Sequence, residues 1–482
     1  MKKNKTFYIT TPIYYANSEP HIGSVYTTIA ADILARWNKL LGKEVFFLTG
    51  TDEHGQKIQE TAEKEGINPK KFVDNIASKF KETFKSLNIS YDNFIRTTDK
   101  EHEDEVKKIL QELYDKRFIY KGKYESYYCV GCEQYLNKSD LVDGKCVLHK
   151  REAELRKEES YLFKLSSFQN KLLELIRKSE YSILPKKKRK EIISFIEGGL
   201  QDISFSRLKE KVYWGIELPF DKNHTCFVWV DAFWNYLTGL KEKRVFEKFW
   251  PADVQLMATD ILRVHATIWP ALLLALNYKL PKTLFVHGYF TVNGQKMSKS
   301  LGNAINPKYF VDKYGADSLR YFLIRSIPFG EDGDFSEEKL IEKHNNELAN
   351  KLGNLVSRVS SLAEKYGIEK TENKLTKKFK IRRIEKLLES FELDKALNEI
   401  FAFVDLCNEY VQHKKIWETK DKKALYELVD SIKAISILLW PFIPSTSEKI
   451  SKHFGFEIKY ENIKKPLAVK KIKKSEILFR KV

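Results

Sequence analysis

Two short stretches of the chain hold residues that can bind phosphate groups. The first is Pro20-His21-Ile22-Gly23-Ser24, which lies between a β-rich run and an expected helix. A helix N-terminus offers free N–H groups and a positive dipole, Gly23 lets a nucleotide approach the backbone, and the His21 side chain can donate to a phosphoryl oxygen. A histidine at a helix start is more often an ordinary surface residue, so this stretch needs support from elsewhere.

The second stretch is Lys296-Met297-Ser298-Lys299-Ser300, which stands between glycines at 294 and 302. Its lysines and serines can form a mobile cationic clamp that neutralises charge on a pentacoordinate phosphorus and on a pyrophosphate leaving group. The ordinary interpretation of five such residues is a solvated loop. The presence of both stretches in one chain favours chemistry on a nucleoside triphosphate.

Four soft metal ligands form two pairs, with two residues inside each pair and thirteen between them: Cys129, Cys132, Cys146 and His149. This spacing lets one turn aim both side chains of a pair at a tetrahedral Zn²⁺. Because protein ligands fill all four positions, the predicted site is closed and structural. The alternative is unrelated thiols near a surface histidine. Five cysteines argue against a disulfide framework, and we expect Cys226 and Cys407 in the core.

These residues need a scaffold, and the first 117 residues alternate between strand and helix signals. Apolar runs at 7–10 and 45–48 resemble buried parallel strands. Helices are expected at 24–41, 57–65, 70–87 and 100–116. Strand, helix, strand in this order predicts an α/β fold with a doubly wound, Rossmann-type parallel sheet, in which ligands bind beyond the carboxyl ends of the strands.

The rest of the chain divides into three further segments. Residues 118–212, which carry the cysteine pairs, are interpreted as an insertion. Strand signals at 225–230, 254–257 and 283–286 place the second half of the sheet in residues 213–335. From 336 to 482 an apolar stripe at three- and four-residue steps predicts a helix bundle: Leu348, Leu352, Leu355, Val359 and Leu362.

Composition narrows the class of protein. Lys and Arg number 84 and Asp and Glu 66 among 482 residues, a formal charge of +18. The surplus favours a polyanionic partner such as nucleic acid, although a lysine-rich solvated surface would also produce it. No apolar run approaches 18 residues, and the basic start is followed by no apolar segment of signal-peptide length. We therefore expect a soluble, cytoplasmic protein without a membrane partner.

At these stretches the chain resembles the class I aminoacyl-tRNA synthetases: residues 21–24 are similar to their HIGH signature and residues 296–300 match KMSKS. Within that class it resembles the methionyl-tRNA synthetases. The residues that carry this likeness, with the cysteine pairs, are TTPIYY (10–15), TGTDEHG (49–55), VWVDA (228–232) and VHGY (286–289). The resemblance extends over nearly the whole chain.

The resemblance implies a two-step reaction. ATP, with Mg²⁺, and L-methionine give methionyl-adenylate, and the methionyl group then passes to the terminal adenosine of initiator and elongator methionine tRNAs. The implied catalytic residues are His21, Lys296 and Lys299. The implied ATP-binding residues are His21, Gly23, Ser24, Asp260, His287, Gly288, Lys296, Ser298 and Lys299. The implied methionine-binding residues are Ile13, Tyr15, Asp52, Trp229, Ala232, Tyr236, Ile261 and His265.

These assignments make chemical sense. Asp52 can pair with the ammonium group of the amino acid, and an aromatic, apolar cavity suits a polarizable thioether. The substrate carboxylate is already a nucleophile, so positioning and charge stabilisation are expected to carry the rate without a general base. Because a missing methyl group is worth only about 1–3 kcal/mol, homocysteine should compete and need editing.

The resemblance also assigns residues 336–482 to anticodon binding, through Asn354, Arg358 and Tyr460. Asn354 and Arg358 are four residues apart and share a helix face, from which amide and guanidinium groups can bond unstacked bases. An exposed, solvated face is the alternative. The basic run 186–190 is interpreted as an exposed turn near the acceptor stem. Relatives that dimerise through an added C-terminal β-barrel extend further, so we expect a monomer.

The chain departs from the family pattern at two places. Ser24 replaces the second histidine of HIGH, and Ala258-Thr259-Asp260 replaces a Gly-Lys-Asp sequence. Two other hypotheses therefore stay open: a class I synthetase for another aliphatic amino acid, and a catalytically inactive paralogue that binds RNA.

Overall fold

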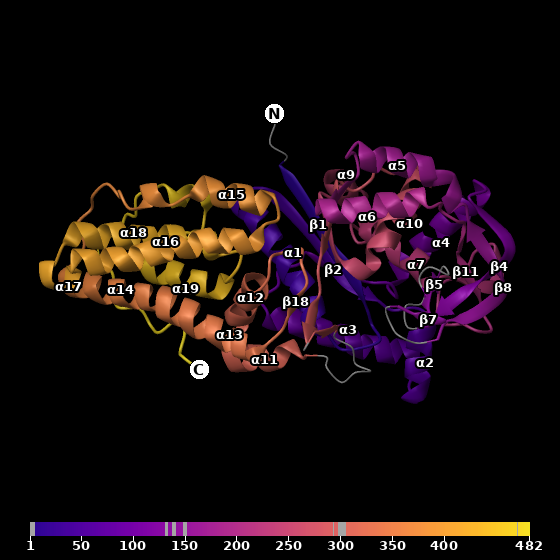
Figure 1. Ribbon diagram of the computed structural model, residues 1–482, viewed down its shortest axis with the longest axis horizontal. Coiled ribbons are helices and arrows are strands. Elements are labelled where there is room, and N and C mark those ends of the chain that lie inside the picture. The colour runs from indigo at the N-terminus through magenta and orange to yellow at the C-terminus, as the bar shows by residue number, and fades with distance from the viewer. Residues whose placement is uncertain are drawn as a thin grey trace.

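A computed structural model describes residues 5–130, 134–136, 141–147, 152–292, 294–296, 305–469 and 471–482. Figure 1 shows an α/β part, in indigo to magenta, beside an elongated helical part in orange and yellow. The α/β part contains a parallel sheet of six strands. Their order is β3 (Asn93–Arg96), β2 (Glu44–Asp52), β1 (Thr6–Tyr15), β14 (Val254–Ala258), β15 (Thr283–His287) and β9 (Ser182–Leu184).

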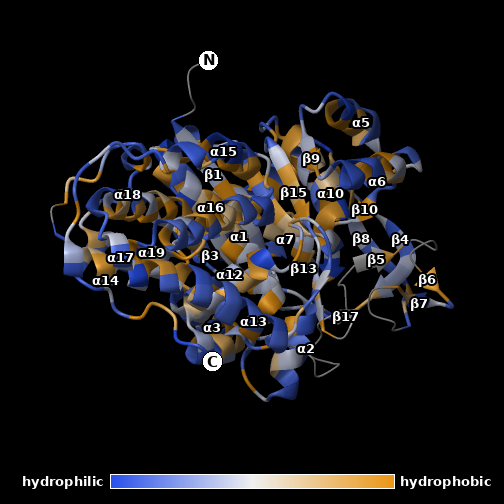
Figure 2. Cartoon of the chain, turned by 60° about the vertical axis from the view of Figure 1, so that its left-hand side comes forward, coloured by the Kyte–Doolittle hydropathy of each residue, from blue (hydrophilic) through white to orange (hydrophobic). Residues whose placement is uncertain are grey.

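The predicted doubly wound sheet is confirmed, and its chain order reverses at β1. The chain leaves β1 through α1 (Ile22–Leu40) to β2 and β3 on one side, and returns much later to β14 and β15 on the other. In such sheets a ligand crevice forms at the reversal, beyond the carboxyl ends of the strands. In Figure 2 the interior strand β15 is mostly hydrophobic, as expected for a parallel strand that is covered on both faces.

Helices α2 (Gln56–Lys64), α3 (Pro69–Ser86) and α4 (Lys100–Asp115) lie within a residue or two of their predicted bounds. Pairing of β1 with β2 shifts in register between Thr10 and Ile13. Pro12 lies in this interval and has no N–H for the ladder, which explains an irregularity at this point.

Two strand predictions need correction. The run at 225–230 does not join the parallel sheet: β13 (Asp221–Cys226) pairs with β11 (Ser206–Leu208) and β12 (Glu217–Leu218), and the chain then turns into α7 (Val228–Phe233). A short, largely buried helix can have the same mainly apolar composition as a buried strand, so periodicity cannot separate them.

The sixth strand, β9, comes from the segment that was interpreted as an insertion. The basic run 186–190 is not a turn. It forms the first turns of α6 (Lys186–Glu197), which packs against α5 (Gln169–Arg177) and α10 (Leu262–Ala275). The protruding part of the insertion is built on β4 (Ile119–Cys129) and β8 (Glu154–Phe163), which pair antiparallel over ten positions.

The helical part confirms the predicted bundle. It is built from the following helices: α13 (Glu337–Lys343), the π-helix η5 (His344–Gly353), α14 (Asn354–Tyr366), α15 (Ile381–Glu389), α16 (Leu393–Lys414), α17 (Ile416–Thr419), α18 (Lys422–Leu439) and α19 (Pro444–Phe454). The predicted stripe is buried at its first four positions, and Leu362 packs against the same core. No helix in the described part of the chain is long and apolar enough to cross a membrane.

A buried guanidinium joins the two parts. Arg320 lies on α12 (Ala316–Arg325), pairs with Asp32 of α1 at 2.7 Å and donates to the carbonyl oxygens of Pro441 and Phe442. Cys226 and Cys407 are in the core, as predicted, and burial raises the pKa of both thiols.

Candidate active site

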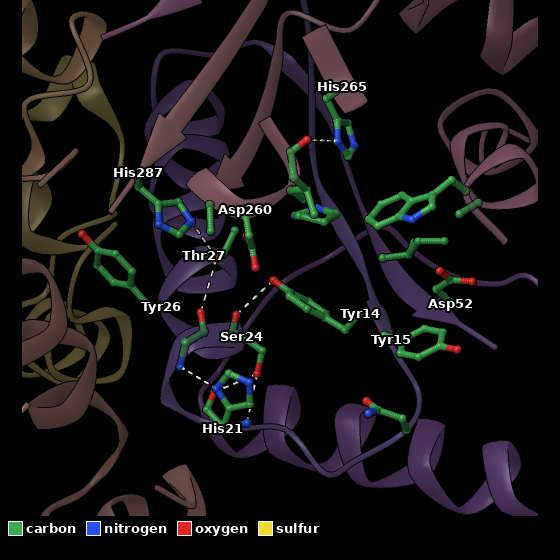
Figure 3. A pocket seen from close by; sticks show the side chains of 18 of the residues that line it. Tyr14, Tyr15, His21, Ser24, Tyr26, Thr27, Asp52, Asp260, His265 and His287 are labelled. Carbon is green, nitrogen blue, oxygen red and sulfur yellow. Dashed lines mark hydrogen bonds between the residues drawn. The ribbon is translucent and has the colours of Figure 1, made fainter. Parts of the chain in front are cut away.

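A cavity of about 380 Å³ lies at the carboxyl ends of β1, β2, β14 and β15. Figure 3 shows its side chains converging from these strand ends and from the start of α1. Apart from Lys296, all described residues that were predicted to contact ATP or methionine line this cavity. They are Ile13, Tyr15, His21, Gly23, Ser24, Asp52, Trp229, Ala232, Tyr236, Asp260, Ile261, His265, His287 and Gly288. The placement agrees with the crevice expected where the strand order reverses.

His21 is the N-cap residue of α1, and its Nδ1 accepts the N–H of Gly23 at 3.0 Å. Because Nδ1 accepts, the proton of a neutral imidazole is on Nε2, which makes that atom a donor. A Cβ atom at position 23 would lie 2.8 Å from the His21 ring, so a residue larger than glycine would displace the ring. The cap therefore both starts the helix and orients the ring at the cavity wall.

Ser24 has a structural role that the sequence analysis missed. Its hydroxyl donates to the carbonyl oxygen of His21 at 2.7 Å and accepts the N–H of His21 at 3.1 Å. Together with the histidine cap this forms a capping box. The departure from HIGH thus stabilises the start of α1. Contact of Ser24 with ATP stays a prediction.

His287 lies on the opposite side of the start of α1. Its Nδ1 donates to the carbonyl oxygen of Gly288 at 2.7 Å, so Nε2, 2.8 Å from the hydroxyl of Thr27, is the acceptor. Burial lowers the pKa of His287 to about 4, which keeps the ring neutral at physiological pH.

The wall of the cavity that was predicted to bind methionine comes from α7, α10 and the short helix α8 (Asn235–Thr238). His265 donates from Nδ1 to the carbonyl oxygen of Ile261 at 2.9 Å and accepts the hydroxyl of Tyr236 at Nε2, 2.8 Å away. Burial lowers the pKa of His265 to about 4. With Trp229 and Ala232, these residues make an uncharged, aromatic surface that suits an apolar thioether.

Two adjacent carboxylates follow one another at the end of β2, and they face different partners. Glu53 is fully buried and receives two hydrogen bonds from Arg96, at 2.7 and 2.8 Å. Asp52 lines the cavity. Of the two, Asp52 is thus the one positioned to meet an ammonium group.

The stability of the chain is expected to fall as the pH falls from 6.5 toward 4. The folded state holds His265 and His287 neutral, with pKa values of about 4 against 6.5 for the unfolded chain, so the unfolded state binds more protons in this range. Each histidine should cost about 2 kcal/mol at pH 5 relative to pH 7. Urea midpoints at the two pH values measure the effect. His265→Gln and His287→Gln should flatten it, and an unchanged slope in both variants would contradict the assignment.

The clamp loop is only partly described. Ser298 and Lys299 lie outside the described residues, as do Met297 and Ser300, and for Lys296 only the backbone position in β17 (Gln295–Lys296) is described. The base of this loop is a hairpin of β16 (Phe290–Val292) with β17. Asp334 holds it, since its Oδ1 accepts the hydroxyl of Thr291 at 2.7 Å and the N–H of Gly294 at 2.9 Å.

The predicted metal ligands are also partly described. Cys129 ends β4 and Cys146 ends β7 (Lys145–Cys146), and both are buried in one small cluster with Leu136. Cys132 and His149 lie outside the described residues. Among the residues that are described, no group of three or more possible ligands occurs, so the zinc site stays a prediction.

The predicted anticodon residues are not all in one place. Asn354 is exposed at the start of α14 and Arg358 is half-buried one turn later. Tyr460 instead packs its ring edge against Trp37 of α1, with centroids 6.0 Å apart. The sequence analysis passed over Trp417, which is 40% exposed on α17, at the end of the bundle farthest from the sheet (Figure 1).

Other residues of the cavity were missed as well: Tyr14, Asn17, Tyr26, Thr27, Lys57, Phe233, Asn235, Tyr289 and Phe290. Some had a signal in the sequence. Thr27 lies four residues after Gly23 and so shares its helix face, and Lys57 lies two residues after the end of the TDEHG stretch. Tyr14 and Tyr289 lie in the TTPIYY and VHGY stretches that carry the resemblance. The others become visible as cavity residues only in the tertiary structure.

Comparison with known proteins identifies relatives of the whole chain. Residues 7–140 and 131–360 match the family described as tRNA synthetases class I (M), and residues 373–479 match the anticodon-binding domain of tRNA ligase. The methionine–tRNA ligase of Caldanaerobacter subterraneus subsp. tengcongensis is 44% identical, over 99% of this chain and 79% of the relative. That of Clostridium tetani is also 44% identical, over 94% and 74%.

Solved structures agree. Mycobacterium tuberculosis methionyl-tRNA synthetase in complex with methionyl-adenylate superposes with a TM-score of 0.94 at 32% identity, covering 98% of this chain and 99% of that one. The free form of the same synthetase gives a TM-score of 0.86 at 29% identity, covering 99% and 98%. The arrangement of this chain is thus closer to the adenylate-bound form.

Proposed function

The chain belongs to the methionyl-tRNA synthetase family, and from this premise we propose how its cavity activates methionine. The activity is that of a methionine–tRNA ligase: ATP and L-methionine give methionyl-adenylate and pyrophosphate, and the methionyl group then passes to the terminal adenosine of a methionine tRNA. The observation that carries the residue assignments is the convergence of the predicted side chains on one cavity from four strand ends.

We propose that the triphosphate lies at the start of α1, with adenosine toward Asp260, His287 and Gly288. The ammonium group of methionine pairs with Asp52, and its thioether packs against the neutral wall of Trp229, Ala232, Tyr236, Ile261 and His265. One substrate is therefore held at each end of the crevice, with the reacting atoms between them.

In the first step a methionine carboxylate oxygen forms a bond to the α-phosphorus, and the bond from that phosphorus to the pyrophosphate oxygen breaks. No proton needs to be removed from the nucleophile. The Nε2–H of His21 and the N–H groups at the start of α1 would stabilise the charge that moves onto pyrophosphate, and Lys296 and Lys299 are proposed to add positive charge to the same end. Mg²⁺ would enter with ATP and neutralise phosphate charge.

Pyrophosphate–ATP exchange that depends on an added amino acid tests the proposal. Exchange with methionine alone among the aliphatic amino acids is the expected result. Exchange with another aliphatic amino acid would support a synthetase of different specificity, and exchange with none would support an inactive RNA-binding paralogue. The methionine–tRNA ligases among the relatives favour the first outcome.

We propose that Cys129, Cys132, Cys146 and His149 hold a structural Zn²⁺. Support comes from the two cysteines that the structure describes, Cys129 and Cys146, which are buried in one cluster with Leu136. A closed four-ligand zinc site would hold the two turns together and contribute folding energy directly.

Cys146→Ser is expected to reduce the zinc content of the purified protein from about one ion per chain to near zero and to lower tRNA charging, because three ligands hold the metal weakly. Metal analysis and charging rates measure this. Cys226→Ala, which removes a buried thiol outside the two pairs, is the matched control and should keep its zinc. A zinc-free but fully active Cys146→Ser enzyme would contradict the role.

We propose that Trp417, rather than Tyr460, stacks on an anticodon base, together with hydrogen bonding by Asn354 and Arg358. A stacking platform has to present its ring to solvent, which Trp417 does at the free end of the bundle. The carbonyl oxygen of Trp417 lies 3.3 Å from the hydroxyl of Tyr366, the last residue of α14, so α14 connects it with Asn354 and Arg358.

Trp417→Ala is expected to lower kcat/KM for charging of methionine tRNA by about tenfold or more, since stacking is worth about 1–3 kcal/mol per base. Methionine-dependent exchange should be unchanged, because α17 is remote from the cavity. Tyr460→Ala serves as the comparison and should affect thermal stability through Trp37 more than charging. If instead Tyr460→Ala lowers charging and Trp417→Ala does not, Tyr460 would be the residue that stacks on the anticodon.

Action as a cytoplasmic monomer stays a prediction, which sedimentation and localisation can test.

A further inference from the structure

A buried carboxylate next to the methionine wall has no part in the chemistry described above. Asp231 of α7 is 1% exposed, and both of its oxygens accept an imidazole N–H. The Oδ2 atom is 2.6 Å from Nδ1 of His54, and the Oδ1 atom is 2.8 Å from Nε2 of His102. Both histidines are themselves buried. Burying a carboxylate costs free energy. A buried carboxylate with hydrogen-bond partners can hold neighbouring elements in one defined position, which apolar packing alone would fix less tightly.

The three residues come from three separate elements. His54 stands two residues after Asp52, on the segment between β2 and α2, and His102 is in the first turn of α4. Asp231 lies on α7 between Trp229 and Ala232, the two wall residues of that helix. The carboxylate thus ties the wall to the strand end that carries the predicted ammonium-binding group.

The surrounding contacts make the tie rigid. His102 Nδ1 lies 2.7 Å from the hydroxyl of Thr238, at the end of α8, and His54 Nε2 lies 3.5 Å from Glu103. Burial alone would lower the pKa of His54, but the carboxylates of Asp231 and Glu103 together more than offset this and raise it to about 10. At neutral pH the pair is therefore a charged one, with the carboxylate negative and His54 positive.

We infer that Asp231, held between His54 and His102, is a positioning residue that sets the distance between Asp52 and the Trp229–Ala232 wall and thereby selects amino acids by length. This inference rests on the proposed function, in which methionine spans that distance from ammonium group to methyl group. Because Trp229 and Ala232 flank Asp231 on a helix of six residues, a shift of Asp231 moves both of them. A crevice of variable length would accept longer and shorter side chains alike.

The test compares Asp231→Asn, His54→Leu and His102→Leu with the wild type in amino-acid-dependent pyrophosphate exchange. The substrates are methionine, ethionine, which is one methylene longer, and norvaline, which is shorter. We expect the KM for methionine to rise at least tenfold, the KM for ATP to change less than twofold, and the preference for methionine over the two analogues to fall at least fivefold.

Conservative variants and a control separate positioning from folding. His54→Asn and His102→Gln put an amide N–H where Nδ1 and Nε2 now donate, and they should recover most of the methionine affinity and selectivity. Asp430→Asn removes another buried carboxylate, paired with Lys433 at 2.6 Å in the helical part, and should lower the melting temperature without changing selectivity. If Asp231→Asn does not fold, the histidine variants decide.

Two results overturn the inference. If the wild-type enzyme shows no methionine-dependent pyrophosphate exchange, the proposed function is overturned, and this inference with it. An active wild type whose leucine variants lose activity only in proportion to their folded fraction, with unchanged methionine KM and selectivity, overturns the inference alone.

Discussion

A His21→Ala enzyme is expected to form methionyl-adenylate about 10²- to 10³-fold more slowly than the wild type, because it loses a donor aimed at the developing charge on the phosphates. The structure places His21 at the cavity with Nδ1 occupied by the N–H of Gly23, which makes Nε2 the donor. Since that interaction strengthens in the transition state, kcat should carry most of the loss. Single-turnover formation of the adenylate measures it.

The His21 ring also caps α1, so a second variant has to separate the two roles. His21→Asn keeps a side-chain acceptor for the helix start, where asparagine is a favoured cap, but has no atom in the place of Nε2. It should be as slow as His21→Ala while keeping wild-type thermal stability, whereas the alanine variant should lose about 1 kcal/mol. An asparagine variant with normal activity would show that His21 acts only as a cap.

Lys299→Ala is expected to lower methionine-dependent exchange by about 10²- to 10³-fold while the KM for methionine stays within about twofold. In the proposed arrangement Lys299 gains its main interaction when charge passes to pyrophosphate, whereas Asp52 and the α7 wall would hold methionine at the other end of the crevice. Removing the lysine should therefore affect the transition state and leave methionine binding nearly intact.

A matched control for Lys299 lies close by in the chain. Lys308 is an exposed lysine in the first turn of α11 (Pro307–Tyr314), paired with Asp312 at 3.1 Å. Lys308→Ala removes the same charge from the same region and should change exchange by less than about twofold, in keeping with the small value of surface ion pairs. Comparable loss in both variants, or a methionine KM that rises as steeply as kcat falls, would argue against a clamp.

Secondary structure was predicted well from the sequence where the hydrophobic residues followed a single helical period. Helices α3 and α4 have clean amphipathic stripes, and their bounds were correct to within a residue or two. The α7 segment lacks such a stripe because all of its residues except Trp229 are buried, and it was mistaken for a strand. Strand β9 is only three residues long and lies in a segment whose cysteine pairs suggested a separate insertion, so nothing local indicated that it would extend the sheet.

Some features of the active site could likewise be predicted from the sequence, and others could not. The types and spacing of His21, Gly23 and the lysine loop favoured chemistry on a nucleoside triphosphate, because phosphate binding at a helix start needs only a few adjacent residues, and the family resemblance supplied the reaction. The sequence alone therefore determined the reaction class, the parallel sheet, the helical domain and the residues expected at the crevice. It could not show that Ser24 closes a capping box, or that His54, His102 and Asp231 meet.

Only the tertiary structure brings Asp231 into contact with His54 and His102. Asp231 is 177 positions from His54 and 129 from His102, and it finds both only because a crossover brings α7 back over the end of β2 beside α4. The propensities of each segment are compatible with many such pairings. Burial of the whole core selects one of them, and with it the distance across which the substrate has to fit.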